Sequence, residues 1–123
     1  MLTLPSTVRV YIALDPVDMR KSLDGLSAEI QRMGLDPLSG HLFCFLNRDR
    51  RLLKLIFFDR SGFVIYYKKL EAGTYQLPKV DPGQQRRMEL EPAELALILE
   101  GIDLSAAPRR KRFFRRPGAL ADC

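Results

Sequence analysis

Apolar residues recur with two different periods along the chain, and the switch between them predicts a mixed α and β fold. Residues 8–14 alternate and are rich in β-branched side chains, which predicts a first strand that Asp15-Pro16 ends. The next apolar residues recur every three or four positions, as on one face of an amphipathic helix. They are Met19, Leu23, Leu26, Ile30 and Met33.

This second segment carries start and stop signals of a helix. Asp18 is a candidate N-cap, and Gly34 stands at the C′ position, where a left-handed residue ends many helices. Gly25, inside the segment, costs about 1 kcal/mol relative to alanine. We interpret Gly25 as the mark of a close approach between helix and sheet.

Three strand candidates follow in quick succession and predict an antiparallel meander: Leu42–Leu46, Leu52–Phe58 and Phe63–Lys69. Their connections are too short for the crossover that a parallel pair needs. In the second connection, Gly62 suits a left-handed position that ends the turn. Tyr75–Leu77 is a candidate extension of the meander.

The remainder of the chain predicts one more helix and a tail. Pro78–Arg87 has no period and is expected to be a surface connection. A helix then begins at Glu91-Pro92, with Leu95, Ile98 and Leu99 on one face, and ends near Gly101. The predicted class is therefore α+β, an antiparallel β-meander with two packed helices: residues 1–104 form one domain, and residues 105–123 form a disordered basic tail.

The composition is that of a single folded domain. Of 123 residues, 46% are hydrophobic and 28% are charged. No apolar run approaches the roughly 18 to 20 residues that span a bilayer, and the first residues do not resemble a signal peptide. We therefore expect a cytoplasmic protein, with Cys44 in the core and no zinc pattern from Cys44, Cys123 and His41.

The net charge of +5 is concentrated in the tail. Six of the 20 basic residues and one of the 15 acidic residues lie in 105–123, so the rest of the chain is neutral. Such a basic arm is typical of nucleic-acid binding, in which Phe113 and Phe114 could stack on bases. The alternative is a solvated, inert terminus. The tail residues expected to bind DNA are Arg109, Arg110, Lys111, Arg112, Arg115 and Arg116.

The acidic residues are candidates for a metal site, but each has a simpler structural role. Asp18 is a candidate helix cap, Asp59 opens a turn, and Asp15 and Asp36 precede prolines. His41 has no recognisable nucleophile and third partner nearby, and the glycines lack phosphate-loop spacing. We expect no catalytic residue, no metal and no cofactor.

Basic residues also cluster in the first connection of the meander. Arg48, Arg50 and Arg51, with Lys54 on the following strand, accompany a single acid, Asp49. Loop charges of this kind are often merely solvated, and contact with DNA phosphates is about equally well supported for the group. These four basic residues are candidate DNA-binding residues.

Short motifs occur in one register from Val8 to Asp103: Asp18-Met-Arg-Lys21, Leu23-Asp-Gly-Leu26, Asp36-Pro-Leu-Ser-Gly-His-Leu-Phe43, Lys54, Asp59-Arg-Ser-Gly-Phe63, Tyr67-Lys-Lys-Leu-Glu71 and Leu99-Glu-Gly-Ile-Asp103. Together they resemble the TnpB-type accessory proteins, products of the second open reading frame, of the IS sixty-six family of bacterial insertion sequences. One departure is Phe57-Phe58-Asp59, where the family often has a tryptophan. The motif residues without an assigned role are Asp18, Met19, Arg20, Lys21, Gly40, His41, Asp59, Gly62 and Lys68.

The resemblance implies a bacterial mobile element in which this protein assists a separate, larger transposase during DNA recombination. Its expected partners are DNA, that transposase and the other accessory protein of the element, and not a membrane. Two functions stay open: a DNA-binding accessory factor, or a protein-interaction subunit that recruits or regulates the transposase without touching DNA. A nuclease is disfavoured, because a transposase core needs three acids on a fold larger than this chain.

Overall fold

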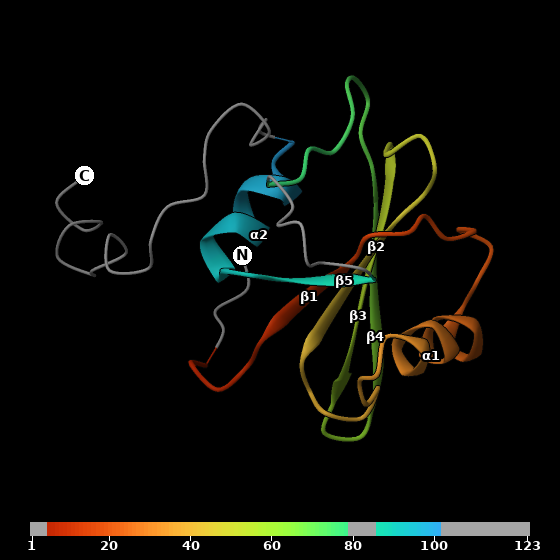
Figure 1. The fold of residues 1–123 in the computed structure, drawn as a ribbon, viewed down its shortest axis with the longest axis vertical. Helices are drawn as coiled ribbons and strands as arrows, with labels where there is room; N and C mark the ends of the chain where they lie inside the picture. The colour runs from red at the N-terminus through yellow and green to blue at the C-terminus, as the bar shows by residue number, and fades with distance from the viewer. Residues whose placement is uncertain (1–4, 79–85, 102–123) are drawn as a thin grey trace, which may run out of the picture.

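The computed structural model describes residues 5–78 and 86–101. This part is an α+β fold in which one helix lies on each face of a five-stranded sheet of order β4-β3-β2-β1-β5 (Figure 1). The elements are β1 (Val10–Ala13), α1 (Leu23–Arg32), β2 (Leu42–Leu46), β3 (Leu52–Asp59), β4 (Gly62–Lys69), β5 (Arg87–Leu90) and α2 (Pro92–Leu99).

The predicted meander is confirmed, because β2, β3 and β4 pair in antiparallel order. The first strand is shorter than predicted but joins the same sheet. It runs parallel to β2, with Tyr11 beside Phe43, and α1 is the crossover between these two strands. The C-terminal ends of β1 and β2 therefore lie next to each other.

Each face of the sheet has its own hydrophobic core. On one face, Leu26 and Ile30 of α1 and Met33 at its C-cap pack against Phe43 and Phe45. The opposite core lies under α2, and its members include Leu95, Ile98, Tyr75, Leu77, Val10, Ile12 and Cys44. Burial in this second core raises the pKa of the Cys44 thiol. All residues of β1 and β2 are buried, as expected of central strands covered on both faces.

Helix α1 begins later than predicted. Ser22, not Asp18, precedes its first residue, Leu23. The Asp18 carboxylate instead accepts a hydrogen bond of 2.8 Å from the backbone N–H of Arg20. Met19 packs against the α1 core from the turn before the helix, and Leu26, Ile30 and Met33 are buried in it. Leu23 is the member of the predicted stripe that is exposed, at 39%.

Gly34 ends α1 as predicted. It has a φ of 81°, and the N–H of Leu35 donates to the carbonyl of Ile30 at 3.2 Å, which is the Schellman arrangement. Gly25 does mark a close approach, but the predicted neighbour, the sheet, was wrong. A Cβ at Gly25 would lie 3.0 Å from the Cβ and Cγ of Lys21, so the close approach is to this side chain and not to the sheet.

The β3–β4 hairpin corrects a second prediction. Asp59 pairs with Gly62, so the connection consists only of Arg60 and Ser61. The left-handed residue is Arg60, with a φ of 54°, and Gly62 belongs to the strand. A two-residue hairpin of this kind requires positive φ at its first loop position, a place where glycine is common and arginine gives no signal.

Strand β5 was not predicted, and Tyr75–Leu77 was wrongly considered a strand. β5 pairs antiparallel with β1, and its Met88 and Leu90 point into the α2 core. Arg87 therefore belongs to a strand and not to a surface connection. Tyr75 and Leu77 are buried in the same core without strand geometry.

Helix α2 begins and ends as predicted. Glu91 is its N-cap and Pro92 its first residue, and the backbone N–H of Glu91 donates to the Glu94 carboxylate at 2.7 Å in a capping box. Gly101, with a φ of 80°, follows its C-cap.

Neither described helix has the length and apolar character needed to cross a membrane. The predicted basic tail, the domain boundary at 104 and residues 79–85 lie outside the described residues.

Candidate nucleic-acid interface

Three loops meet at the upper end of the sheet in Figure 1, where β1, β2 and β4 end. The loop after β1 contacts the end of β2 through a hydrogen bond of 3.0 Å from the N–H of Val17 to the carbonyl of Leu46. The connection 47–51 follows β2, and the segment 70–75 follows β4. This end therefore combines the predicted arginine cluster with the Asp18–Lys21 motif.

The connection 47–51, which we call the arginine loop, has a backbone fixed by its neighbours. The side-chain oxygen of Asn47 accepts hydrogen bonds of 3.0 Å from the N–H groups of Arg51 and Leu52. The carbonyls of Arg50 and Arg51 accept hydrogen bonds from the N–H groups of Tyr75 and Leu70, at 2.6 and 3.0 Å. The loop is thereby held to the sheet end through several of its own backbone groups.

The arginine side chains of this loop point to solvent. Arg48, Arg50 and Arg51 are all exposed, and within the described residues none of the three guanidinium groups forms an ion pair. Asp49 is the acid of the loop. A fixed backbone that presents free guanidinium groups is suited to bidentate contact with phosphate oxygens.

Two further basic residues join the arginine loop at this end. Lys69, the last residue of β4, pairs with Leu52 directly after the loop. Arg86 lies beside the end of β1, where its carbonyl accepts a hydrogen bond of 2.9 Å from Leu14. Sequence reasoning missed Arg86, because only the pairing of β5 with β1 brings it here.

Asp18 and Arg20 of the motif neutralise each other. The Arg20 guanidinium donates to both Asp18 carboxylate oxygens, with the shortest contact, Nη2 to Oδ2, at 2.6 Å. Hydrogen bonds from the side chain and backbone of Arg20 lower the pKa of Asp18 to about 2. Arg20 therefore contributes less free positive charge than its exposure indicates.

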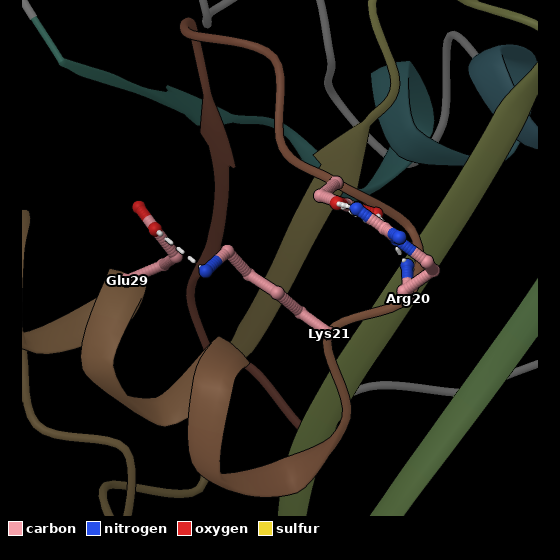
Figure 2. A network of polar contacts seen from close by, with 4 residues as sticks. Arg20, Lys21 and Glu29 are labelled. Carbon is pink, nitrogen blue, oxygen red and sulfur yellow. Dashed lines mark hydrogen bonds and ion pairs between the residues drawn. The ribbon is translucent and has the colours of Figure 1, made fainter.

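Lys21 fastens the same motif to α1 (Figure 2). Its aliphatic stem lies so near Gly25 that a Cβ there would be 3.0 Å from the Cβ and Cγ of Lys21, and its ammonium group lies 3.8 Å from the Glu29 carboxylate. Any other residue at position 25 would force this stem to shift. The motif residues Lys21 and Gly25 thus have a shared structural role.

Lys54 lies apart from the arginine loop. It points to the α1 face of the sheet, where its ammonium group donates a hydrogen bond of 2.8 Å to the carbonyl of Lys21 and lies 5.3 Å from the ring centre of Tyr67. It is half-buried. The structure therefore does not bring Lys54 together with Arg48, Arg50 and Arg51.

The other motif residues are distributed elsewhere. Gly40, Asp59 and Gly62 lie at the opposite end of the sheet, together with His41, whose Nδ1 accepts a hydrogen bond of 3.0 Å from the N–H of Arg9. Lys68 donates to the carbonyl of Leu99 at 2.7 Å, at the C-terminal end of α2. A cation there is favoured by the helix dipole.

A groove of about 560 Å³ lies between α2 and the β3–β4 hairpin. Its walls are largely apolar and include Leu55, Phe57, Val64, Tyr66, Leu95 and Leu99.

Within the described part of the chain, no three acidic, histidine or cysteine side chains are close enough to hold a metal ion. Arg109 to Arg116 lie outside the described residues.

These features define a small α+β protein built on a mixed sheet that displays an arginine loop at one end. The model of the IS66 Orf2-like protein family matches residues 8–109, and the chain belongs to this family. It is therefore a transposition-associated accessory protein of an IS66-type insertion sequence.

Two curated relatives come from Sinorhizobium fredii. The chain is 36% identical to the uncharacterized protein y4hO over 104 residues, which cover 84% of this chain and 88% of the relative. It is 31% identical to the uncharacterized protein y4jC over 115 residues, which cover 93% and 94%. No solved structure matches the chain.

Proposed function

We propose that this accessory protein binds DNA through the phosphate backbone, by means of the arginine loop and the basic tail, and thereby assists a separate transposase. The observation that carries the proposal is the set of three exposed guanidinium groups, free of ion pairs within the described residues, on a backbone held by hydrogen bonds. Phosphate contacts of this kind fix position without reading sequence.

The arginine loop gathers three guanidinium groups that form no ion pair with a described residue, whereas Arg60, which is also exposed and unpaired among those residues, stands alone in the β3–β4 turn. Arg9 is paired with Glu89 at 3.2 Å, and Arg20 with Asp18. By contrast, Arg48, Arg50 and Arg51 keep their charge available for a phosphate. Each phosphate neutralised releases counterions and supplies affinity that falls with salt.

We further propose that the protein acts without catalysing DNA cleavage itself. Three of the acids considered for a metal site have a structural explanation: the Asp18 carboxylate is held by Arg20, Asp36 accepts from the N–H of Leu38, and Asp59 closes a hairpin. Incubation of the purified protein with supercoiled DNA and magnesium or manganese tests this proposal. Cleavage that is lost in Asp18→Asn or Asp59→Asn would contradict it.

The apolar groove beside α2 favours a second candidate function, the docking of a protein partner. An exposed apolar hollow is a common place for a partner segment. In that case the protein would recruit or regulate the transposase without touching DNA. A partner segment in this groove would contact largely apolar side chains, and the arginine loop does not line the groove.

Two measurements on the same samples separate these functions. The first is a DNA titration at about 50 and 200 mM salt, and the second is a pull-down of the transposase of the element. If the protein binds DNA, substitutions in the arginine loop should weaken its affinity for DNA and leave its binding to the transposase unchanged. A chain that retains the transposase but shows no salt-dependent affinity for DNA is an interaction subunit.

A further inference from the structure

β4 is an edge strand whose outer side is open within the described residues. It ends the sheet order, with β3 as its neighbour on one side. The N–H of Leu70 donates to the carbonyl of Arg51, so the hydrogen-bonded pairs with β3 fall on the even-numbered residues of β4. The N–H and C=O groups of Phe63, Ile65 and Tyr67 therefore point outward, and no described residue bonds to them.

The side chains of β4 are unusually apolar for an open edge. Three large hydrophobic side chains of this strand are exposed, with fractions of 39% for Val64, 42% for Tyr66 and 55% for Tyr67. Edge strands of monomeric proteins are commonly protected by proline, a bulge or an inward-pointing charge. β4 pairs with β3 without interruption from Gly62 to Lys69, and its two lysines stand only at its C-terminal end.

We propose that β4 pairs antiparallel with β4 of a second copy of this chain, around a two-fold axis at Ile65. This interaction goes beyond the proposed DNA binding. In this register Phe63 lies opposite Tyr67 of the second copy, and Val64 lies opposite Tyr66 of the second copy. All outward N–H and C=O groups of the strand centre then find partners, and apolar or aromatic side chains oppose one another on both faces.

The sequence of β4 selects this register. A two-fold axis perpendicular to the sheet keeps like faces together, so only residues of equal parity can stand opposite each other. The next such register, centred on Tyr66, would place Lys68 and Lys69 against Val64 and Phe63. Centring on Ile65 places Lys68 against Gly62 instead, where its ammonium group keeps its hydrogen bond to the carbonyl of Leu99, and leaves Lys69 at the border, in solvent.

The second copy is favoured as occupant because the strand is complementary to itself. Around a two-fold axis both copies use the same residues of β4, so each hydrogen bond from one copy to the other is repeated in the reverse direction. The exposed Val64 and Tyr66 of both copies also lie on the α2 face, next to the apolar grooves, which become one continuous surface. If the arginine loops bind DNA as proposed, the dimer presents them at opposite ends of the joint sheet.

Sedimentation equilibrium of the full chain measures the association directly, and disulfide trapping tests the register. The double variant Val64→Cys/Tyr66→Cys, in a Cys123→Ser background, places the new thiols at positions that face each other closely across the two-fold axis. The same two positions on one strand are too far apart to bridge internally. Oxidation should therefore give a covalent dimer from the double variant and little from either single variant.

Tyr67→Glu supplies a second readout, since it places a charge against Phe63 of the second copy while its carboxylate, opposite Lys54 in the monomer, replaces the ring as a partner of the Lys54 ammonium group. It should weaken dimerisation at least about tenfold, the equivalent of about 1.4 kcal/mol, and leave the circular dichroism spectrum unchanged. Leu38→Glu, at an exposed site far from β4 in sequence and in no strand, is the matched control. A wild-type chain that stays monomeric, or single variants that cross-link as well as the double variant, would overturn the proposal.

Discussion

The ammonium group of Lys54, near the start of β3, donates a hydrogen bond of 2.8 Å to the backbone carbonyl of Lys21, in the loop before α1. The two residues are far apart in sequence and belong to two of the short motifs. Lys21 in turn lies across Gly25 and reaches Glu29. This chain of contacts ties the motif loop both to the sheet and to the helix, which explains part of the motif pattern without any reference to DNA.

Lys54→Met should therefore destabilise the fold. The methionine keeps most of the aliphatic stem but leaves the Lys21 carbonyl without its donor, which costs about 1 to 3 kcal/mol for a hydrogen bond to a charged group. Urea unfolding followed by circular dichroism measures this difference. Lys69→Met, at an exposed lysine, is the control and should change the free energy of unfolding by less than about 0.5 kcal/mol. Equal effects of the two substitutions would show that the bond to Lys21 contributes nothing.

The titration of Asp18 reports the pairing with Arg20. Its pKa lies at about 2 in the folded state, below the ordinary value of 3.8. Ionisation of Asp18 thus favours the folded state above about pH 4, and this contribution disappears as the pH falls toward 2. The effect on stability should be small, because both side chains are exposed.

Carboxyl chemical shifts measured by NMR give this pKa residue by residue. In Arg20→Ala the pKa of Asp18 should rise toward its ordinary value, since the side-chain hydrogen bonds of Arg20 are the largest cause of the shift. An Asp18 that titrates normally in the unmodified protein would mean that the pair does not form in solution.

Leu26 and Leu23 lie on the same predicted stripe but differ in burial. Leu26 is fully buried in the α1 core, and Leu23 is 39% exposed at the first position of the helix. Leu26→Ala should cost about 2 to 5 kcal/mol in unfolding free energy, and Leu23→Ala much less. Chemical denaturation of both variants compares them directly. A loss below about 1 kcal/mol for Leu26→Ala would mean that this face of α1 does not form the core.

Features that depend on local pattern were predictable from the sequence. The meander followed from short connections between apolar runs, and Gly34 and Pro92 marked a helix end and a helix start through their own backbone preferences. The arginine loop was found because its three arginines lie within four consecutive residues. Each of these signals lies within a few residues.

Features that depend on distant contacts could not be predicted. β5 has only four residues, and although Met88 and Leu90 alternate with polar neighbours, only β1 makes this short segment a strand. Asp18 is a local exception: it was predicted to be a cap, but its carboxylate pairs with Arg20 two residues later, and α1 begins only at Leu23. Lys54 was grouped with the arginine loop by proximity in sequence, yet the alternation of side chains along β3 places it on the α1 face.

The basic tail remains a prediction, and truncation tests it. If residues 109–116 engage four to six phosphates, the logarithm of the DNA affinity should fall with the logarithm of salt at a slope of about −4 to −5. Deletion after Ser105 should leave a slope no steeper than about −3, because only the three guanidinium groups of the arginine loop would then neutralise phosphates, at about 0.9 each. Fluorescence anisotropy of a labelled duplex at several salt concentrations gives both slopes. An unchanged slope would locate the contacts in the folded body.

If the arginine loop binds DNA phosphates, removing its charges should change how the DNA affinity depends on salt. The loop variant is Arg48→Ser/Arg50→Asn/Arg51→Ser, with asparagine chosen because Arg50 has a φ of 58° that this residue tolerates. The control variant, Arg9→Ser/Arg32→Ser/Arg60→Asn, removes three arginines from elsewhere in the described part of the chain. Arg60, like Arg50, has a positive φ and is therefore also replaced by asparagine.

Both variants should keep the melting temperature nearly unchanged, because exposed charges contribute little to folding. The loop variant should bind duplex DNA more weakly than the control, and its salt slope should be less steep by about 0.9 for each phosphate that it no longer neutralises. The control should retain the slope of the unmodified chain. Loop and control variants with the same affinity and the same slope would contradict the proposed role of Arg48, Arg50 and Arg51.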